Sequence, residues 1–307
     1  MAIKEQLTVS EARLLNQTFV NKIQSGLTKE AQDLGSQFIR EKLRETGFLS
    51  QILPRQAVMD SDLDRDENSE LPKVVVDKEP DSTAAYMPFR ASAANHYFSG
   101  PRFPVHFLKV ESNHFTKNIF ELKTYRMDIR QILKDNSVKD IQEQEDSYFI
   151  DGVDQAITDS PANAIQDLQI SSGAGLTPAV VKLALQALVQ LRRPIGRILM
   201  SEALYLDTLT FDINQVGYNL KEKWYLGGTE APKKVLGVPT VTTIKNDIIP
   251  DNVFYVFSTP EFLGKFYSLQ DPTLYIKEEA DMLDFWTYES VGAAIGNIQS
   301  IIRVTLT

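Results

Sequence analysis

The C-terminal stretch from Leu274 to Thr307, LYIKEEADMLDFWTYESVGAAIGNIQSIIRVTLT, constrains the fold more than any other part of this chain. It follows a short LGVPTV segment and an FLGK turn, and it carries no recognisable catalytic group. We expect it to form strands that close the fold. The aromatic side chains of Phe285, Trp286 and Tyr288 are typical of packing between neighbouring strands, rather than of a platform on which nucleic-acid bases stack.

The overall composition indicates a folded protein that does not read DNA sequence. The chain has 307 residues, enough for one large domain or two of ordinary size, and its 43% hydrophobic and 24% charged residues are close to the averages of globular proteins. Its net charge of -9 repels phosphate backbones and anionic lipid headgroups. A sequence-reading DNA-binding protein is therefore disfavoured.

Cysteine is absent from the sequence, which excludes disulfides, thiolate nucleophiles and zinc–thiolate sites together. This composition fits a reducing cytosol. The first residues, MAIKEQLTVSEARLLNQ, lack the apolar core of a signal peptide, and no stretch approaches the roughly eighteen uninterrupted apolar residues of a membrane span. We therefore expect a protein that is neither secreted nor embedded in a membrane.

The histidines and the acidic runs do not fit metal-binding patterns. His96, His106 and His114 are not arranged as HExxH, and no thiolate is available to complete a zinc site. The acidic segment Asp60–Glu70 alternates like a calcium loop, but Arg65 stands where such a loop needs glycine. We expect a solvated acidic linker, and we expect no metal and no cofactor.

Recognisable enzyme motifs are also missing, although one loop could bind an anion and leaves an enzyme as an alternative interpretation. Ser171–Gly175 is a glycine-rich approach to a helix, and helix N-termini bind anions. The loop lacks the third glycine of a dinucleotide fingerprint and the Gly-Lys-Ser/Thr of a phosphate loop, so we interpret it as a flexible surface loop. Carboxylate pairs such as Glu145 with Asp146 are expected to face water or a neighbouring subunit.

The N-terminal part of the chain predicts two elements whose apolar side chains need a partner to cover them. Residues 8–46 show helical periodicity in two pieces with a narrow apolar stripe, which predicts an amphipathic arm. Residues 73–120 predict two long strands that turn at Gly100-Pro101, and neither face of this hairpin is cleanly apolar. A hairpin of this kind is poorly stable by itself, so we expect it to lie against another chain.

The central and C-terminal parts predict a mixed α+β fold. Residues 121–157 are expected to be helical, with Ser137 as a possible N-cap and Gly152 at the far end or at a break. Thr177 and Pro178 predict the start of a second helix, which is apolar nearly all round and therefore central to a core. Short strands are predicted at RILMS, VPTVTTI and NVFYVFST.

The order of these elements resembles the major capsid protein of tailed bacteriophages, which has the Hong Kong 97 type of fold and shares it with encapsulin nanocompartments. EDSYFIDG (145–152) is similar to the end of the family's spine helix, and TPAVVKLALQAL with RILMSEALYLDTL resembles the helix and the strand-then-helix step of its axial domain. LGVPTVTT (236–243) resembles the family's Gly-x-Pro-Val strand, and VGAAIGNIQSIIRVTL is similar to its closing strands.

The resemblance implies an α+β chain divided as follows: an N-terminal arm with amphipathic helices and an acidic linker (1–77), an E-loop hairpin (78–120), the spine-helix region of a peripheral domain (121–157), an axial domain (158–265), and C-terminal strands of the peripheral domain (266–307). It also implies a structural protein, not an enzyme, whose copies form pentamers and hexamers of an icosahedral virion shell. Such a shell encloses double-stranded DNA without sequence-specific binding and is assembled in the host cytoplasm. Scaffolding, portal or decoration proteins are possible further partners.

Candidate residues for contacts between subunits follow from the hairpin and the spine helix: Phe89, Arg90, Arg102, Phe103, Phe107, Lys109, Glu145 and Asp146. An amphipathic arm and a two-faced hairpin expose surface that only a partner can cover. A charge introduced at Phe103 or Phe107 is therefore expected to impair assembly more than folding.

Three alternatives remain at this stage. An encapsulin-like shell would enclose cargo enzymes instead of DNA. A cytosolic α+β enzyme would use Ser171–Gly175 as its anion-binding loop. A tail or connector component of a virion would form rings or tubes without closed shells.

Overall fold

The structure, a computed structural model, describes residues 47–66, 71–80, 84, 86–90, 97, 100–124, 129–171, 175–208, 211 and 233–307. Side chains of residues 122–136 and 138 lie outside this description. The predicted amphipathic arm (8–46), His96 and most of the glycine-rich loop at Ser171–Gly175 also lie outside it.

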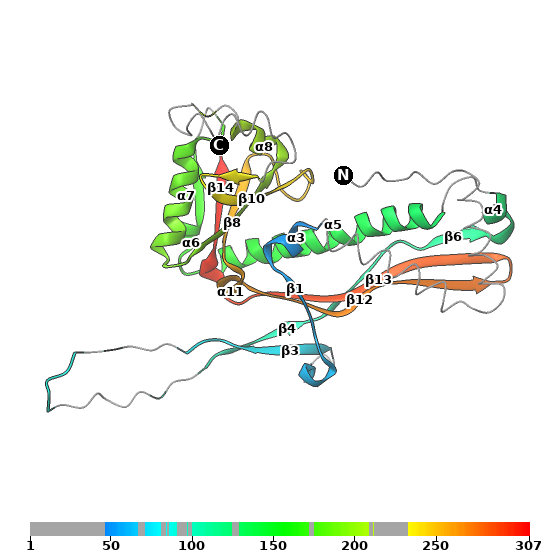
Figure 1. Ribbon diagram of the computed structural model, residues 1–307, viewed down its shortest axis with the longest axis horizontal. Coiled ribbons are helices and arrows are strands. Elements are labelled where there is room, and N and C mark those ends of the chain that lie inside the picture. The colour runs from blue at the N-terminus through cyan, green and yellow to red at the C-terminus, as the bar shows by residue number, and fades with distance from the viewer. Residues whose placement is uncertain are drawn as a thin grey trace.

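The body at one end of the molecule is built on a six-stranded sheet in the order β7-β14-β11-β8-β10-β9 (Figure 1). Its strands are β7 (Asp167–Ile170), β14 (Ile301–Leu306), β11 (Val253–Ser258), β8 (Ile195–Ser201), β10 (Val238–Thr243) and β9 (Lys234–Val235). β7 is parallel to β14 and β8 is parallel to β10, whereas β11 is antiparallel to both of its neighbours. The three predicted strands RILMS, VPTVTTI and NVFYVFST are confirmed in this sheet.

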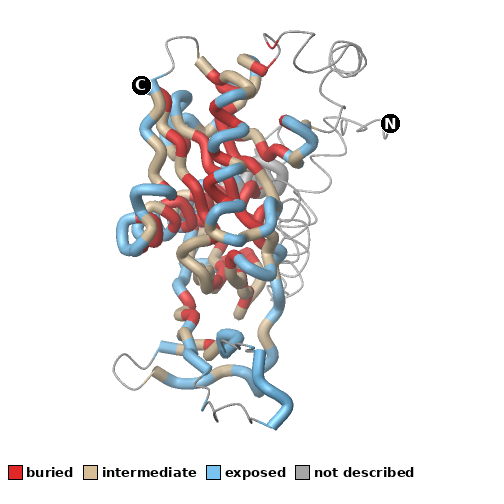
Figure 2. The backbone as a smooth tube through the Cα atoms, turned by 90° about the vertical axis from the view of Figure 1, so that its left-hand side faces the viewer, coloured by how far each residue is buried: buried red, intermediate tan, exposed pale blue. Residues whose placement is uncertain are grey.

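Helices cover both faces of this sheet, which explains why its central strands are apolar at almost every position. Phe254 and Val256 of β11 pack in one core with α7 (Pro178–Gln190). Tyr255 and Phe257, the alternate residues, pack in a second core with the end of α5 (Ile129–Thr158). Figure 2 shows the buried residues concentrated in this body.

The predicted N-terminus of α7 is confirmed in detail. Thr177 is the N-cap, its side-chain oxygen accepts a hydrogen bond from the Val180 amide, and Pro178 is the first helical residue. Short helices complete the body: α6 (Asn163–Gln166), α8 (Glu202–Asp207) and α11 (Pro260–Leu263), with a 3-10 turn at Ile298–Ser300.

The long helix α5 confirms the helical prediction for residues 121–157 but not its predicted ends. α5 runs from Ile129 to Thr158, after a separate helix α4 (Ile119–Thr124). Ser137 lies inside α5 and is buried, so it is not the N-cap, and Gly152 is an exposed interior residue that does not end the helix.

Among the described residues, no helix combines the length and the apolarity that crossing a membrane requires.

The second sheet is an elongated ribbon that runs beneath α5 (Figure 1). β12 (Gly264–Glu279) and β13 (Met282–Ile295) form its antiparallel centre. β1 (Arg55–Ala57) adds in parallel to β12, and β5 (Leu108–Glu111) and β6 (Phe115–Asn118) add to β13. The C-terminal stretch is thus confirmed as strands, but β14 returns to the six-stranded sheet between β7 and β11, so residues 266–307 contribute to both sheets.

A third, small sheet extends away from both others. β3 (Pro72–Asp77) pairs antiparallel with β4 (Arg102–His106) and with the short β2 (Asp64–Arg65), which follows a 3-10 turn at Asp60–Asp62. The prediction that this hairpin turns at Gly100-Pro101 is wrong. The Lys78 amide donates a hydrogen bond to the Pro101 carbonyl, so this dipeptide lies where the returning strand joins β3.

Candidate functional site

The hairpin strand β4 passes over the ribbon at the end of β13, just before the chain continues into β5, which pairs with β13. A Cβ atom at Gly292 would lie 2.7 Å from the His106 carbonyl oxygen, and one at Gly296 would lie 2.9 Å from Cζ of Phe103. Gly292 pairs with Tyr267 and lies on the side of the ribbon that faces away from α5. Two glycines therefore allow the hairpin strand to pass over this side of the ribbon at close approach.

The hairpin beyond the crossing exposes large side chains. Tyr86 and Phe89 are fully exposed, with relative accessibilities of 108% and 111%, and Arg90 is exposed beside them. Arg102 makes an exposed 2.7 Å ion pair with Asp77 across the strands. We call residues 86–90 the hairpin tip. It combines two aromatic rings with a cation, and no other part of the described chain covers these rings.

The side of the ribbon that faces away from α5 carries a row of stacked rings, which we call the aromatic face (Tyr275, Trp286 and Tyr288). The Tyr275 ring stacks on Tyr288 with centroids 4.6 Å apart and on Trp286 at 5.9 Å. At one end His114 stacks on Trp286 at 4.9 Å, and at the other the Lys109 Nζ lies 4.3 Å from the Tyr288 centroid.

The charges around the aromatic face are mixed. Glu111 is the cross-strand partner of Tyr288, and Asp284 is the partner of Lys277. Lys109 Nζ contacts a Glu111 carboxylate oxygen at 2.8 Å. The hydrogen bond to Lys109 lowers the pKa of Glu111; burial opposes this shift, and the charge of Lys109 and the hydrogen bond to His114 add to it. The face therefore offers aromatic rings flanked by carboxyl groups.

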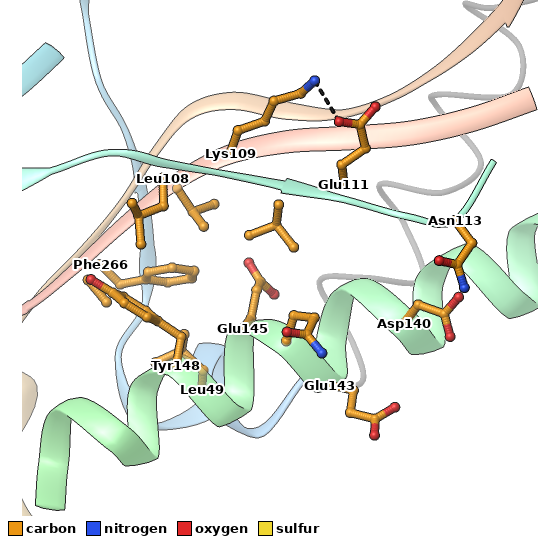
Figure 3. A pocket seen from close by; sticks show the side chains of 14 residues that line it. Leu49, Leu108, Lys109, Glu111, Asn113, Asp140, Glu143, Glu145, Tyr148 and Phe266 are labelled. Atoms are coloured by element: carbon orange, nitrogen blue, oxygen red, sulfur yellow. Dashed lines mark hydrogen bonds and ion pairs between the residues drawn. The ribbon is translucent and has the colours of Figure 1, made fainter. Parts of the chain in front are cut away.

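On the other side of the ribbon, a groove of about 650 Å³ opens between α5 and β5 (Figure 3). Its lining combines the apolar side chains of Leu108, Val110 and Phe266 with the carboxylates of Asp140 and Glu143. Figure 3 shows Lys109 and Glu111 pointing away from α5, on the opposite side of β5. The groove and the aromatic face are thus separate surfaces on the two sides of one sheet.

Glu145, which borders this groove, belongs to a buried charge cluster. Arg55 contacts Glu145 at 2.9 Å and Glu289 at 2.5 Å, and the two carboxylates are 7% and 0% exposed. Burial, repulsion from Glu289 and a side-chain hydrogen bond to Glu289 raise the pKa of Glu145 well above its usual range, although Arg55 acts in the opposite direction. One guanidinium thus serves two buried carboxyl groups.

The next residue, Asp146, connects three parts of the fold. Its Oδ1 accepts a hydrogen bond from the Leu49 amide, and its Oδ2 contacts Lys245 Nζ at 2.7 Å. Lys245 follows β10, so this contact joins α5 to the body. Burial raises the pKa of Asp146, while Lys245 and the backbone amides oppose that shift.

The structure separates the predicted contact residues into two groups. Side chains that are exposed or half-buried, and lie on or near the hairpin and the aromatic face, are Phe89, Arg90, Arg102, Phe103 and Lys109. Phe107, Glu145 and Asp146 are instead buried in their own subunit. The expectation for Phe107 needs correction, because a charge at a side chain that is 3% exposed would destabilise the subunit itself.

The remaining predicted sites have simpler outcomes. Among residues that the structure describes, no group of three or more His, Asp or Glu side chains could hold a metal ion. His114 belongs to the aromatic stack, and His106 contributes its carbonyl to the crossing. Arg55 and Glu289, which sequence reasoning missed, carry no local signal, because Arg55 is separated by 90 and 234 residues from its two partners.

Comparisons with known proteins identify the fold. No family model matches the sequence, and no curated protein matches it. Solved structures do match: the virus-like particle of Pyrococcus furiosus, with 16% identity, a TM-score of 0.55 and coverage of 89% of this chain and 98% of that one. The capsid of Microbacterium phage Oxtober96 matches with 10% identity, a TM-score of 0.60 and coverage of 85% and 92%.

The mature capsid of bacteriophage PhiM1 is a third match, with 9% identity, a TM-score of 0.58 and coverage of 85% of this chain and 87% of that one. These likenesses extend over most of the chain and over most of each relative. The chain therefore has the α+β fold of phage capsid proteins, the Hong Kong 97 type, as its sequence resemblance predicted.

Proposed function

We propose that this protein is the major capsid subunit of a tailed bacteriophage and that it works by assembly rather than by catalysis. The observation that carries the proposal is the uncovered hairpin. Its tip exposes Tyr86 and Phe89 completely, in a fold whose solved relatives include phage capsids. Exposed apolar groups of this kind mark surfaces that bind a partner.

The geometry favours contact between unlike surfaces of identical copies. β4 crosses the ribbon on the side of the aromatic face, so the hairpin leaves the subunit on that same side. In a head-to-tail arrangement, the hairpin of one copy lies over the aromatic face of the next. Contacts between two different surfaces of identical subunits form closed rings when the rotation between copies allows it.

Chemical complementarity supports the same pairing. The hairpin tip offers two aromatic rings and Arg90, while the aromatic face offers stacked rings with the carboxylates of Glu111 and Asp284. Aromatic pairs add about 0.5–1.5 kcal/mol beyond their buried area, and a guanidinium over an aromatic ring adds a comparable amount. Arg102 and Phe103 extend the proposed contact toward the crossing.

The shell proposal gives each part of the chain a role. The axial domain (158–265) contains most of the body, and the peripheral domain combines α5 with the ribbon. Copies would form pentamers and hexamers of an icosahedral virion shell that is assembled in the host cytoplasm and encloses double-stranded DNA. The net charge of -9 suits a container that must not adhere to the polymer packed inside. Scaffolding, portal or decoration proteins would be additional partners.

Size-exclusion chromatography with negative-stain microscopy tests the proposal. The wild-type protein should form closed particles or capsomer rings. The double variant Tyr86→Ser and Phe89→Ser should remain a folded, unassembled subunit, because both rings are exposed and contribute nothing to its own core. The control is Tyr148→Ser, an exposed ring on α5 on the other side of the ribbon, which should assemble normally.

Two outcomes would oppose the proposal. A wild-type protein that stays monomeric even with crowding or with a scaffold argues against a shell. Normal particles from the double variant argue against the role of the hairpin tip.

A second candidate with the same fold is an encapsulin-like shell that encloses cargo proteins, and the virus-like particle of Pyrococcus furiosus is among the structures that this chain resembles. Both candidates share the fold and the mode of assembly. The contents of purified particles distinguish them, since nuclease-protected DNA indicates a genome shell and a co-purifying protein indicates a compartment.

A further inference from the structure

A strap of the chain, residues 47–57, crosses α5 and reaches the ribbon. Phe48, Leu49 and Ile52 of α3 (Phe48–Ile52) are buried, and β1 pairs in parallel with β12. Beyond the strap the chain continues through β2 into β3, the first strand of the hairpin. The strap therefore links the α5–ribbon unit to the root of the hairpin.

Charged contacts fix both ends of the strap to neighbouring carboxylates on α5. At one end the Leu49 amide donates to Asp146, and at the other Arg55 contacts Glu145 at 2.9 Å. Arg55 also contacts Glu289 of β13, and its guanidinium carbon lies 5.2 Å from the Phe266 ring centroid. Asp146 has its own cation, Lys245. Arg55 thus forms ion pairs with both Glu145 and Glu289.

The charges that face this cluster come from every element around it. They are Glu289 from β13, Arg55 from β1, Asp271 from β12, Asp146 from α5 itself and Lys245 from the segment after β10, with Asp140 and Glu143 of α5 at the nearby groove. On β5, Glu111 and Lys109 point to the opposite side of the sheet. Carboxylates exceed cations, so full ionisation leaves an uncompensated negative charge in a buried place.

Protons can reach the cluster from solvent. Glu145 borders the groove beside β5 and also a second cavity of about 490 Å³, which is lined by Ser50, Arg55 and Asp271. A carboxyl group that borders two solvent-connected cavities exchanges its proton without global unfolding.

We propose that Glu145, Glu289 and Arg55 form a proton-dependent latch that holds the strap against α5 and opens as the pH rises. With Glu145 protonated, Arg55 binds both carboxyl groups without charge repulsion between them. When that proton is lost, Glu145 and Glu289 repel each other, and the strap loosens. This latch goes beyond the proposed shell function, because it is a property of the single subunit.

The sign of the effect follows from linkage. The pKa of Glu145 is raised in the folded protein, so the stabilisation from its protonated form is complete below the ordinary glutamate pKa of about 4.3 and is lost as the pH rises through the raised value. Asp146 shifts in the same direction, but its contact with Lys245 opposes the shift. Glu145 is therefore the group to change.

Hydrogen–deuterium exchange on the full-length, unassembled chain tests the latch. Exchange of peptides covering residues 47–57, corrected for the intrinsic pH dependence, is compared with that of β11 from about pH 5 to about pH 9. We expect the strap of the wild type to lose about tenfold or more of its protection relative to β11 over this range, because the repulsion between Glu145 and Glu289 then acts on the strap.

Two variants decide the assignment. Glu145→Gln keeps the shape and the hydrogen bonds of the neutral acid, so its strap should stay protected at every pH. The control Asp151→Asn changes an exposed carboxylate on the same helix, outside the cluster, and should keep the wild-type profile. If Glu145→Gln does not fold, Glu289→Gln removes the same repulsion and should give the same flat profile.

A flat wild-type profile, or a Glu145→Gln or Glu289→Gln strap that still loosens with pH, would overturn the latch. Neither result bears on whether particles form. Conversely, a failure to form particles leaves the exchange experiment unaffected, so the two proposals fail separately.

Discussion

Strands β11 and β4 differ in what covers them. β11 has α7 against one face and α5 against the other, and five of its six residues are buried. β4 is covered mainly where it crosses the ribbon, and two of its five residues are exposed. The difference teaches that the stability of the subunit comes from the body, which completes its own core, whereas the hairpin leaves much of its surface uncovered.

The largest expected difference in stability between the two regions appears when one aromatic ring is removed from each. Phe254→Ala should lower the free energy of unfolding of the unassembled subunit by about 3–5 kcal/mol, because Phe254 is fully buried between β11 and α7. Phe89→Ala, the matched change at the hairpin tip, should alter it by less than about 0.5 kcal/mol. Urea denaturation measures both. Equal losses would abolish the distinction between the two regions.

An intermediate effect is expected at the crossing, where the two regions meet. Gly292→Val should cost about 1–3 kcal/mol and displace β4, because its Cβ would lie 2.7 Å from the His106 carbonyl oxygen. Gly152→Ala in α5 is the control, since a Cβ there meets nothing within 4 Å, and it should stabilise the helix by about 0.5–1 kcal/mol. Thermal unfolding and exchange of β3 and β4 peptides report the difference. Unchanged exchange in Gly292→Val would show that the crossing does not position the hairpin.

The smallest change in stability is expected at β7, the edge strand of the six-stranded sheet. Arg303 binds Asp167 of β7 through two hydrogen bonds of 3.0 and 2.8 Å, and this contact lowers the pKa of Asp167. The resulting stabilisation is present above the ordinary aspartate pKa and is lost as the pH falls through the lowered value. The pair is partly exposed, so Asp167→Asn should cost only about 0.2–1 kcal/mol at neutral pH.

Denaturation at neutral pH and at a series of falling acidic pH values checks this last prediction, because the difference between the wild type and Asp167→Asn should shrink as Asp167 becomes protonated. Divergence in acid would show that the contribution of Asp167 does not depend on its charge.

Local signals in the sequence were sufficient for most elements of the body. Thr177 with Pro178 specifies the start of α7 through neighbouring atoms, and the apolar run of β11 reflects helices on both of its faces. The signals for the ends of α5 were ambiguous, because serine and glycine are tolerated inside a helix that is stabilised by its packing. Gly100-Pro101 misled for a related reason, since a turn-forming dipeptide also fits the place where two strands begin to pair.

The candidate site was predictable only in part. The hairpin was expected to need a partner because neither of its faces is cleanly apolar, and its exposed tip agrees with that reasoning. The cluster around Glu145 depends on contacts between residues far apart in sequence, which no local pattern encodes. An acidic pair on a helix therefore gave no sign that its side chains face inward.

The position of β14 has a consequence for the speed of folding. This strand lies between β7 and β11 in the six-stranded sheet, and its partner β7 is far away along the chain, since Asp167 and Arg303 are 136 positions apart. Closing so long a loop delays the pairing, and chains dominated by such pairings fold slowly. During that delay unfinished molecules expose their future core and can aggregate, so the yield of correctly folded protein should fall as its rate of synthesis rises.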